Sequence, residues 1–143
     1  MPLTFRDLSE GMFATRSVLI GEDQVSSFVA LTADNAPVHT DRDHARSLGY
    51  EGQIAHGMLV GSMYSQILGC ELPGVNAVIM KLSLEMVKPV LIGDTVQYRV
   101  AVSRLSEATR SATMILSALS AAGEQVNRGT AVCIFRGPVS ETN

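Results

Sequence analysis

The segment that most constrains the fold runs from Ile54 to Cys70, where seventeen consecutive residues include no Asp, Glu, Lys or Arg. Apolar or small residues fall on every side of its helical wheel, so a helix built from it must be surrounded by protein or by lipid. The segment is at the lower limit of about 17 residues for a membrane span, and it contains three glycines and several polar side chains. We therefore expect a helix enclosed by a sheet.

The second half of the chain predicts that sheet. Apolar side chains recur at every second position from 78 to 87, and the same alternation returns from 95 to 103. Two further runs, 112–121 and 129–135, are apolar on both parities in places, which indicates strands covered on both faces. Turns of only a few residues separate the runs, so the four strands are expected to be antiparallel.

The first half predicts one edge strand at Met12–Ile20 and short helices. Apolar residues recur at helical spacing from Gln24 to Thr32, and Asp41 is suited to cap a second short helix that ends at Leu48. Together these elements predict an α+β fold in which a curled antiparallel sheet wraps around one long apolar helix. A single curled sheet leaves an edge and an outer face that a partner commonly covers, so a homodimer is expected.

Length and composition bound the class of protein. A chain of 143 residues fits one domain of the usual ~100–150 residues, so a single domain is expected over 1–143. Hydrophobic residues make up 46% and charged residues 17%, which excludes a disordered or collagen-like protein. The formal charge is −3 with no basic block, so we expect neither nucleic acid nor an anionic membrane as partner, and favour a small ligand.

The cysteines and the N-terminus exclude further classes. Cys70 and Cys133 lie far apart with no nearby Cys and His cluster, so we expect two buried thiols rather than a disulfide framework or a metal site. The N-terminal sequence MPLTFRDLSEGM lacks the basic start and apolar run of a signal peptide, and a cytoplasmic location is expected.

A carboxylate and an imidazole lie close together in the stretch FVALTADNAPVHTDRDHA. Asp34 precedes His39 by five residues, and Pro37 stiffens the turn between them. An ionised Asp accepts a hydrogen bond, and His exchanges a proton near neutral pH, so the pair suits the activation of one water molecule. The alternative is that Asp34 caps a turn and His39 is an ordinary loop histidine.

The sequence IAHGM opens the apolar helix and offers a second functional group. The first N–H groups of a helix have no intrahelical partners, and the helix dipole favours negative charge there. Gly57 lacks a Cβ, so a carbonyl oxygen can approach its N–H closely, as in an oxyanion site. The alternative is that His56 is a cap and Gly57 a packing glycine.

These motifs resemble those of the MaoC-like, or (R)-specific, enoyl-CoA hydratases, which have the hot-dog fold. The resemblance rests on DNAPVH at 34–39, IAHGML at 54–59, LGCELPG at 68–74 and KPVLIGDTV at 88–96, and it spans roughly residues 16–136. It implies the hydration of a trans-2-enoyl-CoA to the (R)-3-hydroxyacyl-CoA, or the reverse dehydration, by a homodimer that needs no cofactor.

The resemblance also implies roles for particular residues. Asp34 and His39 would hold the catalytic water, and the Gly57 amide would polarise the thioester carbonyl. Ser65 would join the polar network near that water. With the flanking His56 and Met58, we expect Ser65 to belong to the substrate-binding residues. The acyl tail needs an apolar tunnel, for which the candidates are Met58, Leu59, Met63, Ile79 and Leu82.

One departure from the family pattern affects the catalytic loop. The usual motif reads Asp, any residue, Asn, Pro, aliphatic, His, whereas here Asn35 directly follows Asp34 and Ala36 takes the Asn position. Thr32 and Ala33 also replace the common Ser and Gly. The pair keeps its residue types and spacing, but the Asn that would brace the loop is displaced by one position.

Two other functions use the same kind of fold. A thioesterase usually needs an Asp or Glu in the apolar helix or at its start, and the segment here has none. A non-catalytic acyl-binding subunit is the second alternative, and the displaced Asn35 favours it. The retained Asp34 and His39 argue against it, because a silent subunit needs neither.

Overall fold

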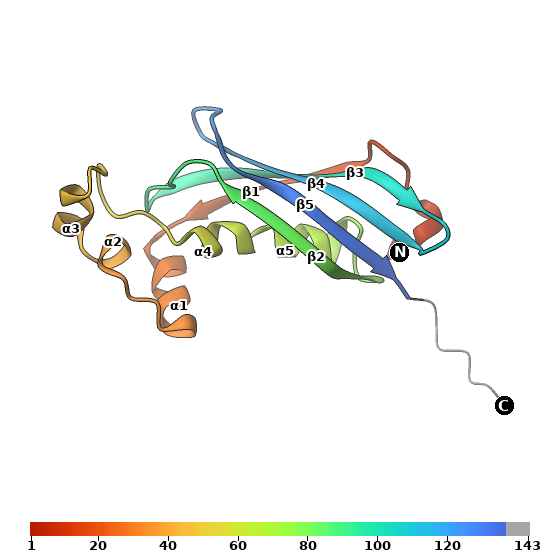
Figure 1. Cartoon of the computed structure of the whole chain (residues 1–143), viewed down its shortest axis with the longest axis horizontal. Coiled ribbons are helices and arrows are strands. Elements are labelled where there is room, and N and C mark those ends of the chain that lie inside the picture. The colour runs from red at the N-terminus through yellow and green to blue at the C-terminus, as the bar shows by residue number, and fades with distance from the viewer. Residues whose placement is uncertain (137–143) are drawn as a thin grey trace.

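A computed structural model describes residues 1–136, which form a five-stranded antiparallel sheet and a set of short helices (Figure 1). The predicted domain 1–143 thus ends seven residues beyond the described part. The strands are β1 (Phe13–Ile20), β2 (Ala77–Met86), β3 (Asp94–Ser106), β4 (Ser111–Ser120) and β5 (Gln125–Phe135). The helices are η1 (Phe5–Asp7), α1 (Glu22–Thr32), α2 (Pro37–Thr40), α3 (Arg42–Ser47), α4 (Gly57–Ser62), α5 (Tyr64–Gln66) and η2 (Ile67–Glu71).

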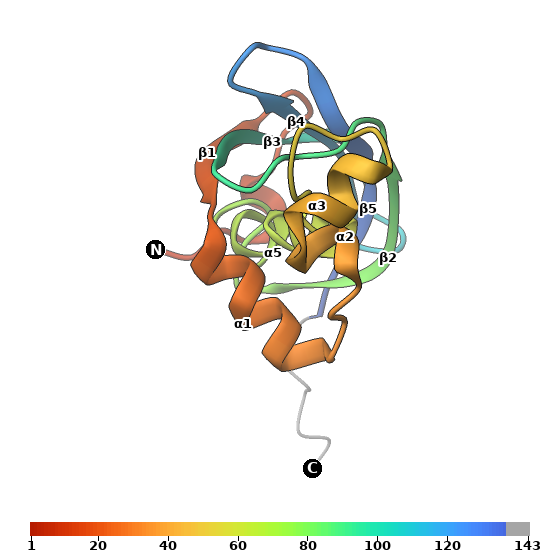
Figure 2. The same ribbon diagram turned by 90° about the vertical axis from the view of Figure 1, so that its left-hand side faces the viewer.

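The sheet has the strand order β1-β3-β4-β5-β2, and every neighbouring pair is antiparallel. β1 and β2 are therefore its two edges. Figure 2 shows the sheet curving around the segment formed by α4, α5 and η2, with α1, α2 and α3 grouped at one end of the molecule. The α+β architecture predicted from the sequence is confirmed, including the edge position of β1.

The central helical segment begins at Gly57, three residues later than predicted, because Ile54 and Ala55 are extended. Ile54 forms an isolated bridge with Leu91, and the Ala55 N–H donates to the carbonyl of Val90 at 2.7 Å. The segment breaks at Met63 and ends in a π-helical turn. Its buried face is provided by Leu59, Val60, Tyr64, Ile67 and Leu68. Within residues 1–136 no helix has the length and hydropathy that a membrane span requires.

A pair of tyrosines ties this segment to the sheet. The ring of Tyr64 meets that of Tyr98 on β3 edge to face, with centroids 4.9 Å apart. The Tyr98 hydroxyl donates to the carbonyl of Val60 on α4 at 2.7 Å. Burial raises the pKa of both phenols well above the usual range, so both stay protonated. These contacts fix the position of the helical segment along the inner face of the curled sheet.

The edge strand β2 does not bury one of its faces within the chain, as its alternation had suggested. A bulge between Ile79 and Lys81 interrupts the register with β5, and only Ala77 and Leu84 are even half-buried. Its exposed apolar side chains are Val78, Ile79, Met80, Leu82 and Met86. The alternation from 78 to 87 therefore does not give one buried face in the single chain, because β2 is an edge strand that the helical segment covers only in part.

The cysteine prediction is half right. Cys133 on β5 is buried, and burial raises the pKa of its thiol to about 11. Cys70 is exposed, because it lies on the outer side of the last helical turn rather than against the sheet.

Candidate active site

The loop that carries Asp34 is shaped by the ends of two helices. α1 ends at Thr32, and Ala33 adopts a left-handed conformation with φ of 60°, which turns the chain away from the helix. The Asp34 carboxylate accepts the N–H of Ala36 at 3.3 Å, and Pro37 then occupies the first position of α2. This short helix, which the sequence analysis did not predict, presents His39.

Three titratable side chains meet at this loop. Asp34, His39 and His56 each place one nitrogen or oxygen atom within 4.8 Å of the other two. The Asp34 side chain is exposed, His39 is half-buried and His56 is buried. The structure therefore brings Asp34 and His39 together, and His56 joins them from the start of the central helix.

Hydrogen bonds to backbone carbonyls define which ring nitrogens carry hydrogen. His39 Nδ1 lies 2.7 Å from the carbonyl oxygen of Ile54, and His56 Nε2 lies 2.9 Å from the carbonyl oxygen of Asp34. Because a carbonyl only accepts, each of these nitrogens is the donor. The neutral His39 ring therefore keeps its lone pair on Nε2. The His56 lone pair is on Nδ1, a buried atom with no hydrogen-bond partner among the described residues.

The His56 ring is held between two other rings. It stacks on His39 with centroids 3.9 Å apart and planes inclined by 29°, and Phe28 contacts it with a centroid distance of 4.7 Å. The lone pair of each ring nitrogen lies in the plane of its own ring, so the two lone pairs lie in separate, stacked planes. The arrangement therefore suits separate hydrogen bonds better than joint coordination of one metal ion.

Gly57 begins α4 directly after His56, so its N–H has no intrahelical partner. The Met86 side chain covers it from β2, since a Cβ at Gly57 would lie 3.2 Å from Met86 Cγ. Gly57 and His39 line the same pocket, of about 310 Å³, so the predicted oxyanion donor and the predicted water-binding histidine share one cavity.

This pocket has mostly apolar walls. Its apolar lining consists of Ile54, Ala55, Val60, Met86, Val87, Pro89, Val90 and Val126. The polar side chains are those of His39, Tyr50, Lys88 and Asn127. Lys88 is exposed and pairs with Glu124 at 3.0 Å. No acidic side chain among residues 1–136 lines this pocket, so it suits an uncharged ligand group, and Lys88 places a positive charge at its rim. We call it the Gly57 pocket.

His39 also borders a second pocket, of about 440 Å³, on the side of α1. Glu22, Thr40 and Gln53 contribute its polar lining, and Gln53 Nε2 donates to the His39 carbonyl at 3.3 Å. The imidazole thus forms part of the wall between two cavities.

Several predicted substrate-binding residues do not lie at the Gly57 pocket. Met58 is 75% exposed and Ser65 is exposed, and neither lines a pocket that contains His39. Of the tunnel candidates, Leu59 and Met63 line a separate pocket of about 340 Å³ beside Phe28. Ile79 and Leu82 are among the exposed residues of β2.

Sequence reasoning missed Asn127 and Met86 as pocket residues. Asn127 is a single amide in a largely apolar strand, and it comes two residues before a glycine. The available signal was a polar residue at a position of β5 where the side chain faces inward. Reading it required knowing that β5 pairs with β2, which brings Asn127 opposite Met86.

Comparison with known proteins places the chain among hydratases. The model of the MaoC like domain matches residues 7–122. The chain is 39% identical to an (R)-specific enoyl-CoA hydratase of Rhodospirillum rubrum, over 71% of this chain and 70% of the relative. It is 34% identical to the enzyme of that name from Aeromonas caviae, over 91% of this chain and 97% of the relative.

Solved structures agree with the sequence relatives. The (R)-hydratase of A. caviae, described as involved in PHA biosynthesis, superposes with a TM-score of 0.88 at 34% identity, over 92% of this chain and 99% of that one. An unliganded R-hydratase from Pseudomonas aeruginosa gives a TM-score of 0.88 at 28% identity, over 94% of this chain and 86% of that one. The hot-dog fold expected from the motifs is confirmed.

Proposed function

The chain belongs to the MaoC-like domain family, and we propose that it catalyses the (R)-specific hydration of a trans-2-enoyl-CoA, or the reverse dehydration. The observation that carries the proposal is the meeting of Asp34 with His39, because His39 also lines the pocket that contains Gly57, whose N–H is the first of α4. Two relatives with the same activity in their names support the same reaction class.

The reaction adds the oxygen of water to C3 of the conjugated thioester while electron density moves onto the thioester oxygen. A donor at that oxygen stabilises the developing charge, and removal of one such donor typically costs about 2.7–4 kcal/mol of transition-state stabilisation. The Gly57 N–H is suited to this task because it has no intrahelical partner and the helix dipole acts in the same direction.

The two side chains of the pair divide the proton transfer. Asp34 has one carboxylate oxygen free of the Ala36 contact, and it accepts the proton as the hydroxyl adds to C3. His39 directs the lone pair of Nε2 at the same water and orients it, because Nδ1–H is held by the Ile54 carbonyl. The proton then passes through this pair to C2, so one whole water molecule is added.

We propose further that the domain is a homodimer that covers the exposed apolar residues of β2. Edge strands with unpaired backbone groups and a row of apolar side chains favour association with a second chain. Met86 belongs both to this strand and to the Gly57 pocket, so association at β2 lies beside the site.

Hydration of crotonyl-CoA tests the proposed activity. Loss of the enoyl absorbance without release of free thiol is the expected result, and a chiral analysis should find the (R)-3-hydroxy product. Release of thiol would instead show a thioesterase, and neither signal would favour the non-catalytic subunit.

Substitutions at the pair test the site. Asp34→Asn and His39→Gln should each lower the maximal rate by about 10²–10⁴-fold, the usual contribution of a general acid or base. Asp43→Asn and His44→Gln on α3 are matched controls, since both side chains are exposed and lie outside the cluster. Parent activity in both site variants would refute the assignment.

A further inference from the structure

One buried amide in the Gly57 pocket takes no part in the proposed water addition. Asn127 lies on β5, is fully buried, and pairs in register with Met86 of β2 and Ala118 of β4. Among the described residues that line the pocket, it is the polar side chain with no exposed surface, whereas Lys88 is exposed. Asn127 therefore marks the interior end of the cavity, and Lys88 its solvent side.

The hydrogen bonding of this amide is incomplete. Its Nδ2 donates to the thioether sulfur of Met86 at 2.9 Å, which is a weak acceptor. Its Oδ1 is buried and has no partner among the described residues. A buried carbonyl oxygen without a donor is unfavourable, and most such groups in folded proteins are paired. The pocket wall thus contains an unsatisfied acceptor, which a ligand reaches when the flexible Met86 side chain beside it moves aside.

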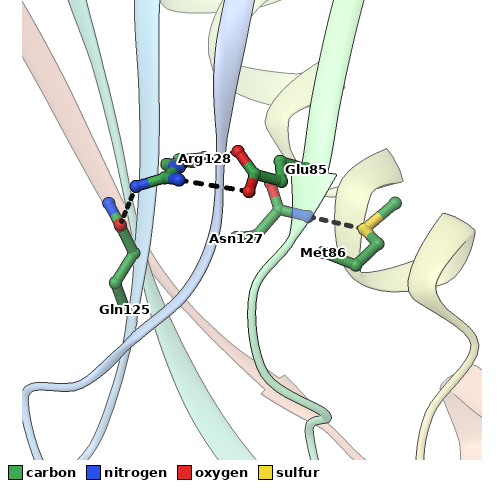
Figure 3. Close-up of polar contacts among 5 residues, drawn as sticks. All are labelled: Glu85, Met86, Gln125, Asn127 and Arg128. Carbon is green, nitrogen blue, oxygen red and sulfur yellow. Dashed lines mark hydrogen bonds and ion pairs between the residues drawn. The ribbon is translucent and has the colours of Figure 1, made fainter.

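Asn127 and the next residue, Arg128, point to opposite sides of β5. Figure 3 shows Asn127 on the side of β5 that faces the helix, with Met86, whereas Arg128 points to the opposite side. Arg128 there forms an ion pair with Glu85 at 2.9 Å and a long contact with Gln125 at 3.5 Å. The polar groups on the outer side of the strand thus have partners. The acceptor without a partner is on the side of β5 that faces the pocket.

The position of Asn127 relative to the reacting atoms follows from Met86. The Met86 side chain contacts the Asn127 amide through its sulfur and lies against the Cα of Gly57. When a thioester carbonyl binds the Gly57 N–H, an acyl chain that extends past Met86 meets Asn127 behind it. A group that reaches Asn127 belongs to the acyl chain beyond the double bond.

We propose that Asn127 is a specificity-determining residue that accepts a hydrogen bond from a hydroxyl group on the acyl chain of the substrate. The favoured substrates are then hydroxylated trans-2-enoyl thioesters rather than purely aliphatic ones. This inference rests on the proposed hydratase function. A site with a buried polar group discriminates against an analogue that lacks the matching hydroxyl, because the group then stays unpaired.

Paired substrates test the proposal. Each ω-hydroxy-trans-2-enoyl-CoA in a short series is compared with the aliphatic trans-2-enoyl-CoA that has one more carbon, so that both have the same number of heavy atoms. For the best pair, kcat/KM of the parent protein should be about tenfold higher for the hydroxylated substrate, as expected for one buried hydrogen bond. Equal values across the series would overturn the proposal.

Variants separate recognition from a structural role. Asn127→Leu has similar volume and no hydrogen bonds, and it should abolish the preference by lowering kcat/KM for the hydroxylated substrate to the value for its aliphatic partner. Its melting temperature should not fall, because an unpaired buried amide is removed. Thr130→Val, at an exposed position of the same strand, is the control and should keep the preference. A parallel loss on both substrates in Asn127→Leu would show a structural role and refute the proposal.

Binding of unreactive ligands gives a readout independent of turnover. The saturated ω-hydroxyacyl-CoA should bind the parent about tenfold more tightly than its aliphatic partner, and Asn127→Leu should bind the two equally. Retention of the binding preference in Asn127→Leu would contradict the proposal. If the parent hydrates no enoyl-CoA at all, the proposed function fails, and this result is separate from an absent preference in an active enzyme.

Discussion

The imidazole of His56 lies on that of His39 with ring centroids 3.9 Å apart, and the same His56 ring donates to the backbone carbonyl of Asp34 at 2.9 Å. One buried side chain therefore contacts both members of the proposed water-binding pair. His39 in turn is held from its other nitrogen by the carbonyl of Ile54. The pair is positioned by the segment 54–56, which leads directly into the central helix.

From its sequence position, His56 was expected to contact substrate. Its contacts in the structure instead indicate a positioning residue. His56→Phe keeps an aromatic ring against His39 but loses the hydrogen bond to the Asp34 carbonyl, so kcat should fall by about tenfold with little change in KM. Steady-state kinetics with crotonyl-CoA measures both constants. His44→Phe on α3 should change neither. A rise in KM with constant kcat would instead support direct substrate contact.

Gly57→Ala should reduce kcat/KM at least tenfold without unfolding the protein. The added methyl group points at flexible Met86 atoms 3.2 Å away, which are able to shift, but it obstructs the approach of the thioester oxygen to the N–H. Gly69→Ala, later in the same helical segment, meets no atom within 4 Å and should keep full activity. Equal activity of the two variants would argue against the Gly57 N–H as the carbonyl donor.

Gly129→Ala should strongly destabilise the fold. A Cβ at this position of β5 would overlap the carbonyl oxygen of Ser83, so β2 and β5 would have to separate. We expect a loss of about 3 kcal/mol or more in the free energy of unfolding, at the upper end of single substitutions. Denaturant unfolding measures it, with Gly52→Ala as an unobstructed control. A loss below about 1 kcal/mol would contradict this close approach of the two strands.

Stability should fall as the pH rises above about 9. The pKa of the Cys133 thiol is raised by burial from 9.0 to about 11, so between these values the folded chain binds more protons than the unfolded chain. The contribution of the thiol, at most about 2–3 kcal/mol, is fully present below pH 9 and is lost as the pH approaches 11. Tyr64 and Tyr98 act in the same direction, because burial also raises the pKa of each phenol.

Urea unfolding at a series of pH values from 8 to 11 measures this effect. Cys133→Ala should show a shallower decline than the parent, whatever its stability at pH 8, and Cys70→Ala should follow the parent because Cys70 is exposed. Identical slopes in the parent and Cys133→Ala would exclude the thiol as the cause.

Leu82→Glu should convert the proposed dimer into monomers. A charge on β2 would have to be desolvated when a second chain covers this edge, which is costly for an unpaired carboxylate. Sedimentation velocity measures the change in mass. Leu31→Glu on α1, which is 83% exposed, places the same charge away from β2 and should remain dimeric. A monomeric parent chain, or a dimeric Leu82→Glu, would contradict association through β2.

Local patterns in the sequence predicted most of the secondary structure. The period of two located β2 and β3, and two apolar runs located β4 and β5, each within a few residues. The Asp41 cap of α3 is confirmed by its hydrogen bond from the His44 N–H at 3.0 Å. The start of the central helix was wrong by three residues, because the extended pairing of Ile54 with Leu91 depends on a segment 37 residues away.

What the sequence determined by itself was therefore the set of elements and the approach of Asp34 to His39, since periodicity, capping and a proline-stiffened turn act over a few residues. Tertiary structure decided the strand order β1-β3-β4-β5-β2, the stacking of His56 on His39 and the entry of Asn127 into the pocket. Each of these joins residues far apart in the chain. Such contacts depend on how the whole sheet closes around the helix, which no short segment encodes.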